Sequence, residues 1–222
     1  MSDSEDPIVI KDQIVEAMLD HVPFDGWSEA ALKAGLLSVY DELTISPAMA
    51  HSYFQGGLME MADHYADWLD RKVERAALDA GLDGMGVTEK IHTCIRLRLQ
   101  LCHPHREAVR KLVTYLSLPQ NSPSAAKMAW RTCSRIWYLA GDQSADWNHY
   151  SKRGLLVPVY AVTMLYWLGD DADEQDDYPD TWAFLESRLK NVVEVFSLPK
   201  KITQAFANKT GALFSKQAFQ RR

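Results

Sequence analysis

The sequence predicts an all-α protein, and three features support this prediction. Signals of β-strands are nearly absent from the chain. Residues that favour helix starts recur, and Gly, Pro and acidic turns interrupt the apolar periodicity. The segments between these interruptions predict about eight to ten helices. Their expected ranges are 10–21, 28–36, 46–54, 57–80, 88–103, 105–117, 123–140, 143–168, 179–196 and 199–217.

Serine residues mark three of the expected helix starts. Ser28 precedes a run of good helix formers, where its hydroxyl can accept a hydrogen bond from an otherwise unpaired backbone N–H. Ser46-Pro47 and Ser122-Pro123 combine such a capping hydroxyl with a proline at the first helical position, where a missing N–H costs nothing. We therefore expect helices to begin directly after these three serines.

The expected helices divide into two groups by length. Short helices with tight turns come first, and longer helices rich in Trp, Met and Leu follow. A helix near 28–36, a turn at 40–45 and a helix from Pro47 have the proportions of a helix-turn-helix unit. The predicted organisation is a disordered tail at 1–9, a helix-turn-helix-like unit at 10–70, a larger helical domain at 71–197 and a basic amphipathic tail at 198–222.

The charge of the first unit argues against DNA binding. Residues 45–54 resemble the recognition-helix region of TetR-type regulators, which ends in an aromatic pair. Affinity for duplex DNA requires several Lys or Arg side chains that face phosphates. Between residues 22 and 70, Lys33 is the only such residue, and eight acids bring the net charge of this segment to −7. We expect no nucleic-acid partner and interpret Met49, Tyr53 and Phe54 as core residues.

Composition indicates a globular protein of a reducing compartment. With 222 residues, 47% of them hydrophobic, the chain can bury a full-sized core. The three cysteines are odd in number and lack CxxC spacing, so no disulfide framework is expected. The acidic N-terminus is unlike a secretory or mitochondrial leader, which favours a cytoplasmic location. The apolar stretch 154–169 is shorter than the roughly 18 residues of a membrane span and contains Pro158, so it predicts a buried helix.

Motifs for catalysis or metal binding are missing from the sequence. His103-Pro104-His105 lies at a helix break, and the other histidines are dispersed without HExxH spacing. The acidic run 170–177 lacks the glycine and final glutamate of a calcium loop and is interpreted as a solvated turn. No glycine-rich phosphate loop or GxSxG occurs. We therefore expect no metal, no cofactor and no enzymatic activity.

Four separated motifs resemble the Coq-nine family of ubiquinone-biosynthesis accessory proteins. They are HVPFDGWS at 21–28, LPQNSP at 118–123, WYLAGDQSADWNHYSKR at 137–153 and TWAFLESRL at 181–189. Their order is that of the family, and the resemblance covers most of the chain. It implies a TetR-like bundle that has lost its DNA-reading role, which agrees with the charge of residues 22–70. It also suggests an alphaproteobacterial member of the family.

The resemblance implies a binding function. Members are expected to bind isoprenoid or quinone lipid intermediates and to present them to the di-iron demethoxyubiquinone hydroxylase. Asp146, Trp147 and Tyr150 can share one helix face, as a docking surface requires. Alternatively, Trp147 faces inward and Asp146 only stabilises a helix start. The family's partner-contact patch corresponds here to Ile136, Asp146, Trp147, Asn148, His149 and Tyr150, with Trp147 and His149 where relatives carry Phe and Trp.

A lipid pocket requires long apolar helices that do not close fully on each other. The same apolar positions could equally form a plain core or a dimer interface, because Met and aromatic residues at helical spacing usually pack. The residues expected to bind lipid are Met128, Trp137, Leu156, Tyr160, Met164, Leu165 and Trp167.

The end of the chain predicts contact with a membrane surface. The net charge of the whole chain is −6, whereas residues 199–222 contain six bases and no acid. Near an anionic bilayer each base adds roughly 1 kcal/mol of attraction, although a solvated tail is the alternative. The expected membrane-binding residues are Lys200, Lys201, Ile202, Phe206, Leu213 and Phe214.

The sequence thus favours a homodimeric lipid-binding protein. We expect it to associate peripherally with the inner membrane from the cytoplasm, or from the mitochondrial matrix if it is organellar. One alternative is a ligand-responsive TetR-type regulator, which predicts salt-sensitive DNA binding. A second is a small enzyme, which predicts turnover without a partner.

Overall fold

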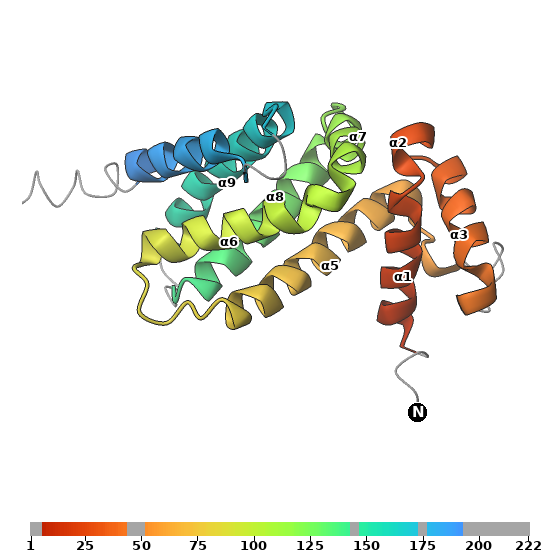
Figure 1. Ribbon diagram of the computed structural model, residues 1–222, viewed down its shortest axis with the longest axis horizontal. Helices are drawn as coiled ribbons and strands as arrows, with labels where there is room; N and C mark the ends of the chain where they lie inside the picture. The colour runs from red at the N-terminus through yellow and green to blue at the C-terminus, as the bar shows by residue number, and fades with distance from the viewer. Residues whose placement is uncertain (1–5, 44–51, 143–146, 173–176, 193–222) are drawn as a thin grey trace, which may run out of the picture.

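A computed structural model of the protein describes residues 6–43, 52–142, 147–172 and 177–192. The regular secondary structure in these ranges is helical, which confirms the predicted all-α class. A further helix covers residues 179–192, at the end of the last described range. Figure 1 shows α1, α2 and α3 at one end of the molecule and the other helices in the rest. The named elements are α1 (Pro7–Leu19), α2 (Val22–Asp25), α3 (Glu29–Leu43), α5 (Gly57–Asp79), α6 (Val87–Cys102), the 3-10 helix η2 (His103–His105), α7 (Arg106–Leu116), α8 (Ser122–Leu139) and α9 (Trp147–Gly169).

Most predicted helices lie within a few residues of the observed ones, and the largest differences are near the N-terminus. α1 begins at Pro7 because the side chain of Asp6 accepts a 2.9 Å hydrogen bond from the backbone N–H of Ile8 and a proline follows the cap. Residues 7–9 are therefore helical, and the predicted disordered tail at 1–9 is wrong for them. The predicted helices at 46–54 and 199–217 lie largely or wholly outside the described residues.

Two of the three serine caps can be compared with the structure. Ser28 caps α3 as predicted, because its hydroxyl accepts a hydrogen bond from Ala31 N at 3.3 Å. Ser122 instead lies inside α8 and donates its hydroxyl hydrogen to Pro119 O at 2.9 Å. The cap position belongs to Asn121, so the predicted capping role of Ser122 is wrong by one residue.

The close contact between α1 and α3 depends on a glycine. A Cβ added at Gly35 would lie 2.7 Å from both the backbone N and the Cα of Met18. Backbone atoms cannot move aside as a flexible side chain can, so any larger residue here would push the two helices apart.

α5 joins the N-terminal helices to the rest of the molecule. In Figure 1 it extends from the end occupied by α1 and runs beside α6 and α8. Met61, Tyr65, Leu69 and Val73 recur at helical spacing on its buried side. The predicted boundary between residues 70 and 71 falls inside this helix, and one continuous core extends from α1 to residue 189. The two predicted units therefore share a helix and a core.

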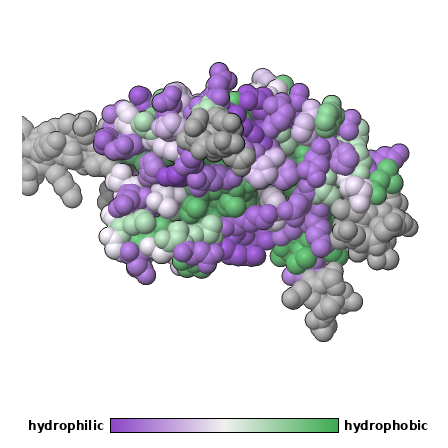
Figure 2. Space-filling model, in the orientation of Figure 1, coloured by the Kyte–Doolittle hydropathy of each residue, from purple (hydrophilic) through white to green (hydrophobic). Residues whose placement is uncertain are grey.

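α9 is buried on one side only. Leu156, Tyr160 and Trp167 are buried, whereas Val162 and Leu165 are exposed by 40% and 56%. The prediction of a buried helix at 154–169 is thus correct for a single face. Figure 2 shows a mostly hydrophilic surface in which apolar side chains form limited patches. Among the described residues, no helix combines the length and hydropathy that membrane crossing demands.

Candidate ligand pocket

Five helices of the larger part of the molecule enclose a cavity of about 340 Å³. This volume lies within the range of roughly 300–1,000 Å³ that is typical of small-molecule sites. The helices α5, α6, α7, α8 and α9 all contribute to its wall. The residues that line the pocket are Ala62, Tyr65, Ala66, Leu69, Arg98, Cys102, Val109, Leu112, Val113, Leu116, Ser117, Ala125, Ala126, Met128, Ala129, Thr132, Val157, Tyr160, Ala161, Met164 and Leu165.

The pocket reaches the surface beside α9. Ser117 after α7, Ala126 in α8, and Ala161 and Leu165 in α9 all line the pocket and are exposed. Leu165 is more than half exposed although its side chain is apolar. These four residues form the rim of the pocket, through which an apolar ligand could enter.

The buried end of the pocket adjoins an ion pair, of which Arg98 lines the pocket and Asp70 lies outside its lining. Arg98 and Asp70 are only 4% and 3% exposed, and the Arg98 guanidinium donates to the Asp70 carboxylate. Arg98 Nε also donates to the Tyr160 hydroxyl at 2.7 Å, and Thr132 Oγ1 donates to Asp70 at 3.0 Å. Buried charges require such pairing, because desolvation of an unpaired ion is very costly. The two charges of the pair cancel, so this end of the pocket is polar without net charge.

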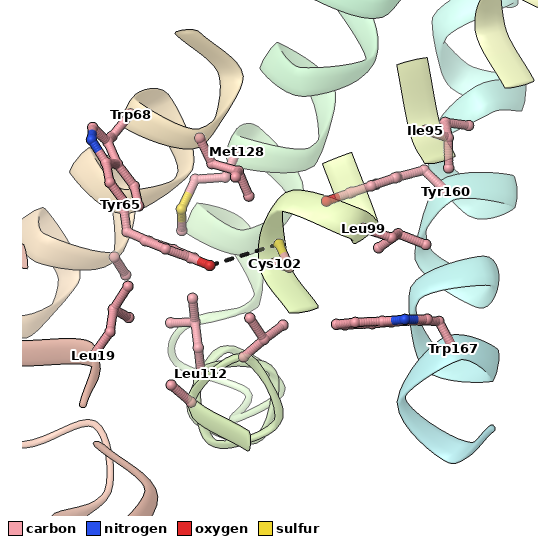
Figure 3. Packing of buried hydrophobic residues seen from close by; sticks show 14 of the residues in the cluster. Leu19, Tyr65, Trp68, Ile95, Leu99, Cys102, Leu112, Met128, Tyr160 and Trp167 are labelled. Carbon is pink, nitrogen blue, oxygen red and sulfur yellow. Dashed lines mark hydrogen bonds between the residues drawn. The ribbon is translucent and has the colours of Figure 1, made fainter. Parts of the chain in front are cut away.

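A second polar pair lies close to the first. Tyr65 and Cys102 approach within 3.7 Å through their hydroxyl oxygen and sulfur. In Figure 3 the hydroxyl groups of Tyr65 and Tyr160 point inward from opposite sides, with Cys102 between them. Burial raises the pKa of Tyr65, Cys102 and Tyr160 above their ordinary values. All three groups therefore remain protonated and neutral at neutral pH.

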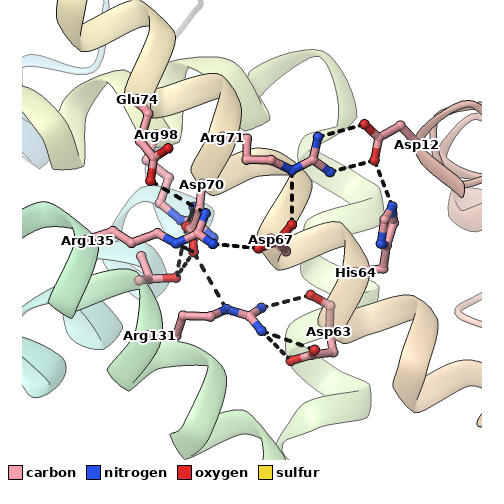
Figure 4. Close-up of polar contacts among 11 residues, drawn as sticks. Asp12, Asp63, His64, Asp67, Asp70, Arg71, Glu74, Arg98, Arg131 and Arg135 are labelled. Atoms are coloured by element: carbon pink, nitrogen blue, oxygen red, sulfur yellow. Dashed lines mark hydrogen bonds and ion pairs between the residues drawn. The ribbon is translucent and has the colours of Figure 1, made fainter. Parts of the chain in front are cut away.

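Further charges connect this end of the pocket to α1. Arg135 Nε lies 4.0 Å from Asp70 and its Nη2 donates to Asp67 at 2.6 Å. Asp67 also accepts from Arg71 Nε at 3.0 Å, and Arg71 forms two hydrogen bonds with Asp12 of α1. Figure 4 shows this chain of alternating charges along α5. The pocket and the N-terminal helices are thus joined by a continuous polar network.

His64 also contacts Asp12 at the α1 end of the network. Its Nε2 lies 2.7 Å from Asp12 Oδ1, an interaction that by itself would raise the pKa of the imidazole. The pKa of His64 nevertheless lies below its ordinary value, because burial penalises the charged imidazolium and the positive charges of Arg71 and Lys11 add to this effect.

The predicted lipid-binding residues divide into two groups. Met128, Tyr160, Met164 and Leu165 line the pocket. Trp137, Leu156 and Trp167 are buried in the core outside its lining. Trp137 donates its indole N–H to Lys152 O at 3.2 Å, and Trp167 packs edge-on against Tyr178. These three predicted positions therefore have packing roles in the structure.

Sequence reasoning missed the contributions of α5, α6 and α7 to the pocket. Asp70 and Arg98 gave a usable signal, since each is a charged residue within the apolar stripe of its helix. Such residues are rarely buried without a partner, so two of them with opposite charges predict a pair. The wall residues Val109 and Leu112 carried no comparable signal, because the same spacing describes an ordinary core helix.

The structure describes only part of the predicted partner patch. Ile136 is only 2% exposed and belongs to the hydrophobic core, so it cannot offer a direct docking surface. Tyr150 is 61% exposed, and its ring stacks with that of Trp130 at a centroid distance of 6.3 Å. Trp147, Asn148 and His149 begin α9, although their side chains are outside the description, as is Asp146.

The other predicted sites are only partly covered by the structure. The membrane-binding residues at 200–214 lie outside the described residues. Within the described ranges, no three His, Cys, Asp or Glu side chains come together as metal ligands would. Cys94, Cys102 and Cys133 are buried free thiols, and burial raises the pKa of Cys94 to about 11 and that of Cys133 to about 12.

The fold and the pocket together define a TetR-like helical protein with a cavity of ligand size. A solved TetR transcriptional regulator from Nitrosomonas europaea superposes with a TM-score of 0.64, covering 83% of this chain and 98% of its own. The sequences are 21% identical, so this likeness establishes the fold alone.

The chain belongs to the COQ9 family. The sequence model of that family matches residues 122–195. The ubiquinone biosynthesis protein COQ9-B of Xenopus laevis, a mitochondrial protein, is 30% identical over 207 residues, covering 90% of this chain and 68% of its own length. The human mitochondrial COQ9 is 28% identical, and the chain spans 63% of its length. The predicted family resemblance is thereby confirmed.

Proposed function

We propose that this protein is a non-catalytic accessory factor of ubiquinone biosynthesis that binds an isoprenoid or quinone lipid in its pocket. The supporting observation is the pocket itself, which has an almost wholly apolar wall and a rim on the protein surface. Burial of an apolar chain against such a wall stabilises a complex in proportion to the area removed from water. The relatives from Xenopus and human are named ubiquinone biosynthesis proteins, which supplies the pathway.

The partner in this proposal is the demethoxyubiquinone hydroxylase, which receives the lipid at the start of α9. Tyr150 provides an exposed aromatic side chain there, and exposed Tyr and Trp residues commonly contribute most to interface affinity. Asp146, Trp147, Asn148 and His149 complete the docking surface. Ile136, a buried residue of α8, acts indirectly by packing α8 into the core.

The membrane in this proposal is the source of the lipid. The basic tail, with Lys200, Lys201, Ile202, Phe206, Leu213 and Phe214, holds a homodimer at the inner-membrane surface. Replacing Lys200 and Lys201 by Glu in the full chain should reduce flotation with anionic vesicles. Unchanged flotation would contradict the role of these two residues.

Lipid binding is tested by native mass spectrometry and lipid extraction of the full-length protein. We expect co-purified isoprenoid lipids in the wild type and their loss in an Ala161→Trp variant, whose indole would obstruct the rim. Ala183→Trp is the matched control, because Ala183 is exposed on the helix at 179–192 and lies outside the pocket. An empty wild-type protein that takes up no added quinone would contradict the proposal.

Docking is tested separately with the purified hydroxylase. Trp147→Ala and Tyr150→Ala should weaken hydroxylase binding while lipid content stays unchanged. Tyr138→Ala is the control, since Tyr138 is also an exposed tyrosine, at 74%, and belongs to α8. If both patch variants bind the hydroxylase as tightly as the control does, the docking surface is assigned wrongly.

A further inference from the structure

The two ends of the pocket differ in chemistry, and this difference gives a bound lipid a direction. We propose that the ligand enters with an uncharged, oxygen-bearing head group first and places it beside Tyr160 and Arg98, while its apolar chain extends to the rim. This inference rests on the proposed lipid-binding function and adds the class of head group and its orientation.

Tyr160 has an unused hydrogen-bond donor at the inner end of the pocket. Its hydroxyl oxygen accepts from Arg98 Nε at 2.7 Å, which leaves the hydroxyl hydrogen available. No acceptor for that hydrogen occurs among the residues that the structure describes. Tyr160 is buried and lines the pocket, so an oxygen of the ligand can supply the missing acceptor.

The charge balance of this end selects a neutral head group. The positive charge of Arg98 is matched by Asp70, which also accepts from Thr132. The nearby guanidinium groups of Arg131 and Arg135 are hydrogen-bonded to Asp63 and Asp67, respectively. A phosphate would therefore bring a buried negative charge to a site where the described guanidinium groups are already paired with carboxylates, which is costly. A quinone carbonyl, a phenol or a methoxy oxygen meets no such penalty.

Among the described residues, the rim offers no equivalent polar site. Its apolar members, Ala126, Ala161 and Leu165, suit a hydrocarbon chain that continues out of the pocket. Ser117 is the one rim residue with a polar side chain, and it is exposed to water that competes for its hydroxyl. A buried hydrogen bond at Tyr160 is worth more than a solvated one at Ser117, because water does not replace it.

The test compares two ligands that differ only in their oxygens. The probes are a geranyl-substituted trimethylbenzoquinone, whose ring has no unsubstituted position for addition of a thiol, and the corresponding geranyl-substituted trimethylbenzene. Binding to the full chain is measured by native mass spectrometry for the wild type, Tyr160→Phe and Tyr115→Phe. Tyr115 lies in α7 outside the pocket lining, so Tyr115→Phe is a control that removes a tyrosine hydroxyl away from the bound ligand.

We expect Tyr160→Phe to weaken quinone binding about tenfold, the loss of one hydrogen bond, and to leave hydrocarbon binding unchanged. Tyr115→Phe should alter neither. Equal weakening for both ligands would show that Tyr160 only packs against the ligand, and an unchanged quinone affinity would show that the head group lies elsewhere. Either result overturns the orientation. A wild type that binds neither ligand would instead refute the proposed lipid-binding function.

A second measurement on the wild type does not depend on the folding of a variant. The quinone is prepared with a photoreactive diazirine at the end of its geranyl chain, and the cross-linked residue is identified by mass spectrometry. Cross-links at the rim, to Ala126 or Leu165, are expected. Cross-links to Tyr65 or Cys102 would place the chain end inside and overturn the orientation.

Discussion

At the scale of single residues, the most unusual feature is a pair of opposite charges in an apolar core. Asp70 from α5 and Arg98 from α6 are almost fully buried and bind each other, and Thr132 from α8 adds a hydrogen bond. A buried pair is weak evidence for stability as such, since desolvation offsets much of the attraction. Loss of one partner should nevertheless destabilise the protein, because the other charge would remain buried and unpaired.

Asp70→Ala should therefore destabilise the protein strongly. We expect the free energy of unfolding, measured by urea denaturation, to fall by about 3–5 kcal/mol. Asp79→Ala, at the exposed C-terminal end of the same helix, should change it little. Equal stability of the two variants would mean that the Asp70–Arg98 pair does not contribute as the structure indicates.

At the scale of helices, two glycines in helical segments have opposite roles. Gly35 allows the backbones of α1 and α3 to approach, whereas a Cβ at Gly154 in α9 would meet no atom within 4 Å. Gly35→Ala should lower the free energy of unfolding by about 1–3 kcal/mol through overpacking. Gly154→Ala should raise it by about 0.5–1 kcal/mol, because Gly loses more conformational entropy in a helix than Ala does. Thermal or urea unfolding of both variants tests this difference in sign.

If both substitutions shift the free energy of unfolding in the same direction, the result would contradict the conclusion that Gly35 is required for the close packing of α1 against α3. Gly35→Ser provides a further check, since the larger side chain should be at least as destabilising as alanine at this position.

The stability of the protein should also depend on pH through His64 of α5, which contacts Asp12 of α1. Burial holds the pKa of His64 in the folded protein below its ordinary value of about 6.5. Below that pH the unfolded chain binds the proton more readily, so the free energy of unfolding falls as the pH drops from about 6.5 toward the lowered pKa. His64→Gln should reduce this pH dependence in urea titrations at a series of pH values.

His92 in α6 provides a comparison, because burial lowers its pKa as well. His92→Gln should therefore remove a separate part of the same pH dependence. In the double variant, the free energy of unfolding should change least with pH. If His64→Gln leaves the pH dependence of the free energy of unfolding unchanged, the role assigned to burial of His64 is contradicted.

At the scale of the whole molecule, a TetR-like architecture is combined with an acidic segment at residues 22–70. The helices α1 to α3 lie at one end of this fold, and residues 22–70 have a net charge of −7. α5 and the shared core join these helices to the pocket. In this protein α1 to α3 contribute to the core, and Asp12 of α1 belongs to the polar network.

The charge distribution predicts that the full chain does not bind duplex DNA. Fluorescence anisotropy with a labelled duplex should show no binding by the folded protein at low salt, the condition that favours electrostatic association. Salt-sensitive binding at micromolar protein concentration would instead support the alternative of a ligand-responsive regulator.

Helix content, helix order and family membership were determined by the sequence alone. Periodicity and capping are local properties, so the ranges of α5, α6, α8 and α9 could be predicted to within a few residues, as could the Ser28 cap. The motifs at 118–123 and 137–153 were sufficient for the family, and the charge of residues 22–70 argued against DNA binding before the fold was known.

Only the tertiary structure decided which apolar residues line a cavity and which fill the core. Leu156 and Tyr160 are one helical turn apart and both buried, yet only Tyr160 lines the pocket. The difference depends on side chains from α5, α6, α7 and α8, which approach α9 from distant parts of the chain. The pairing of Asp70 with Arg98 was likewise decided by helix packing. Periodicity identifies the apolar face of each helix, but whether several such faces close completely depends on how their side chains fit together in space.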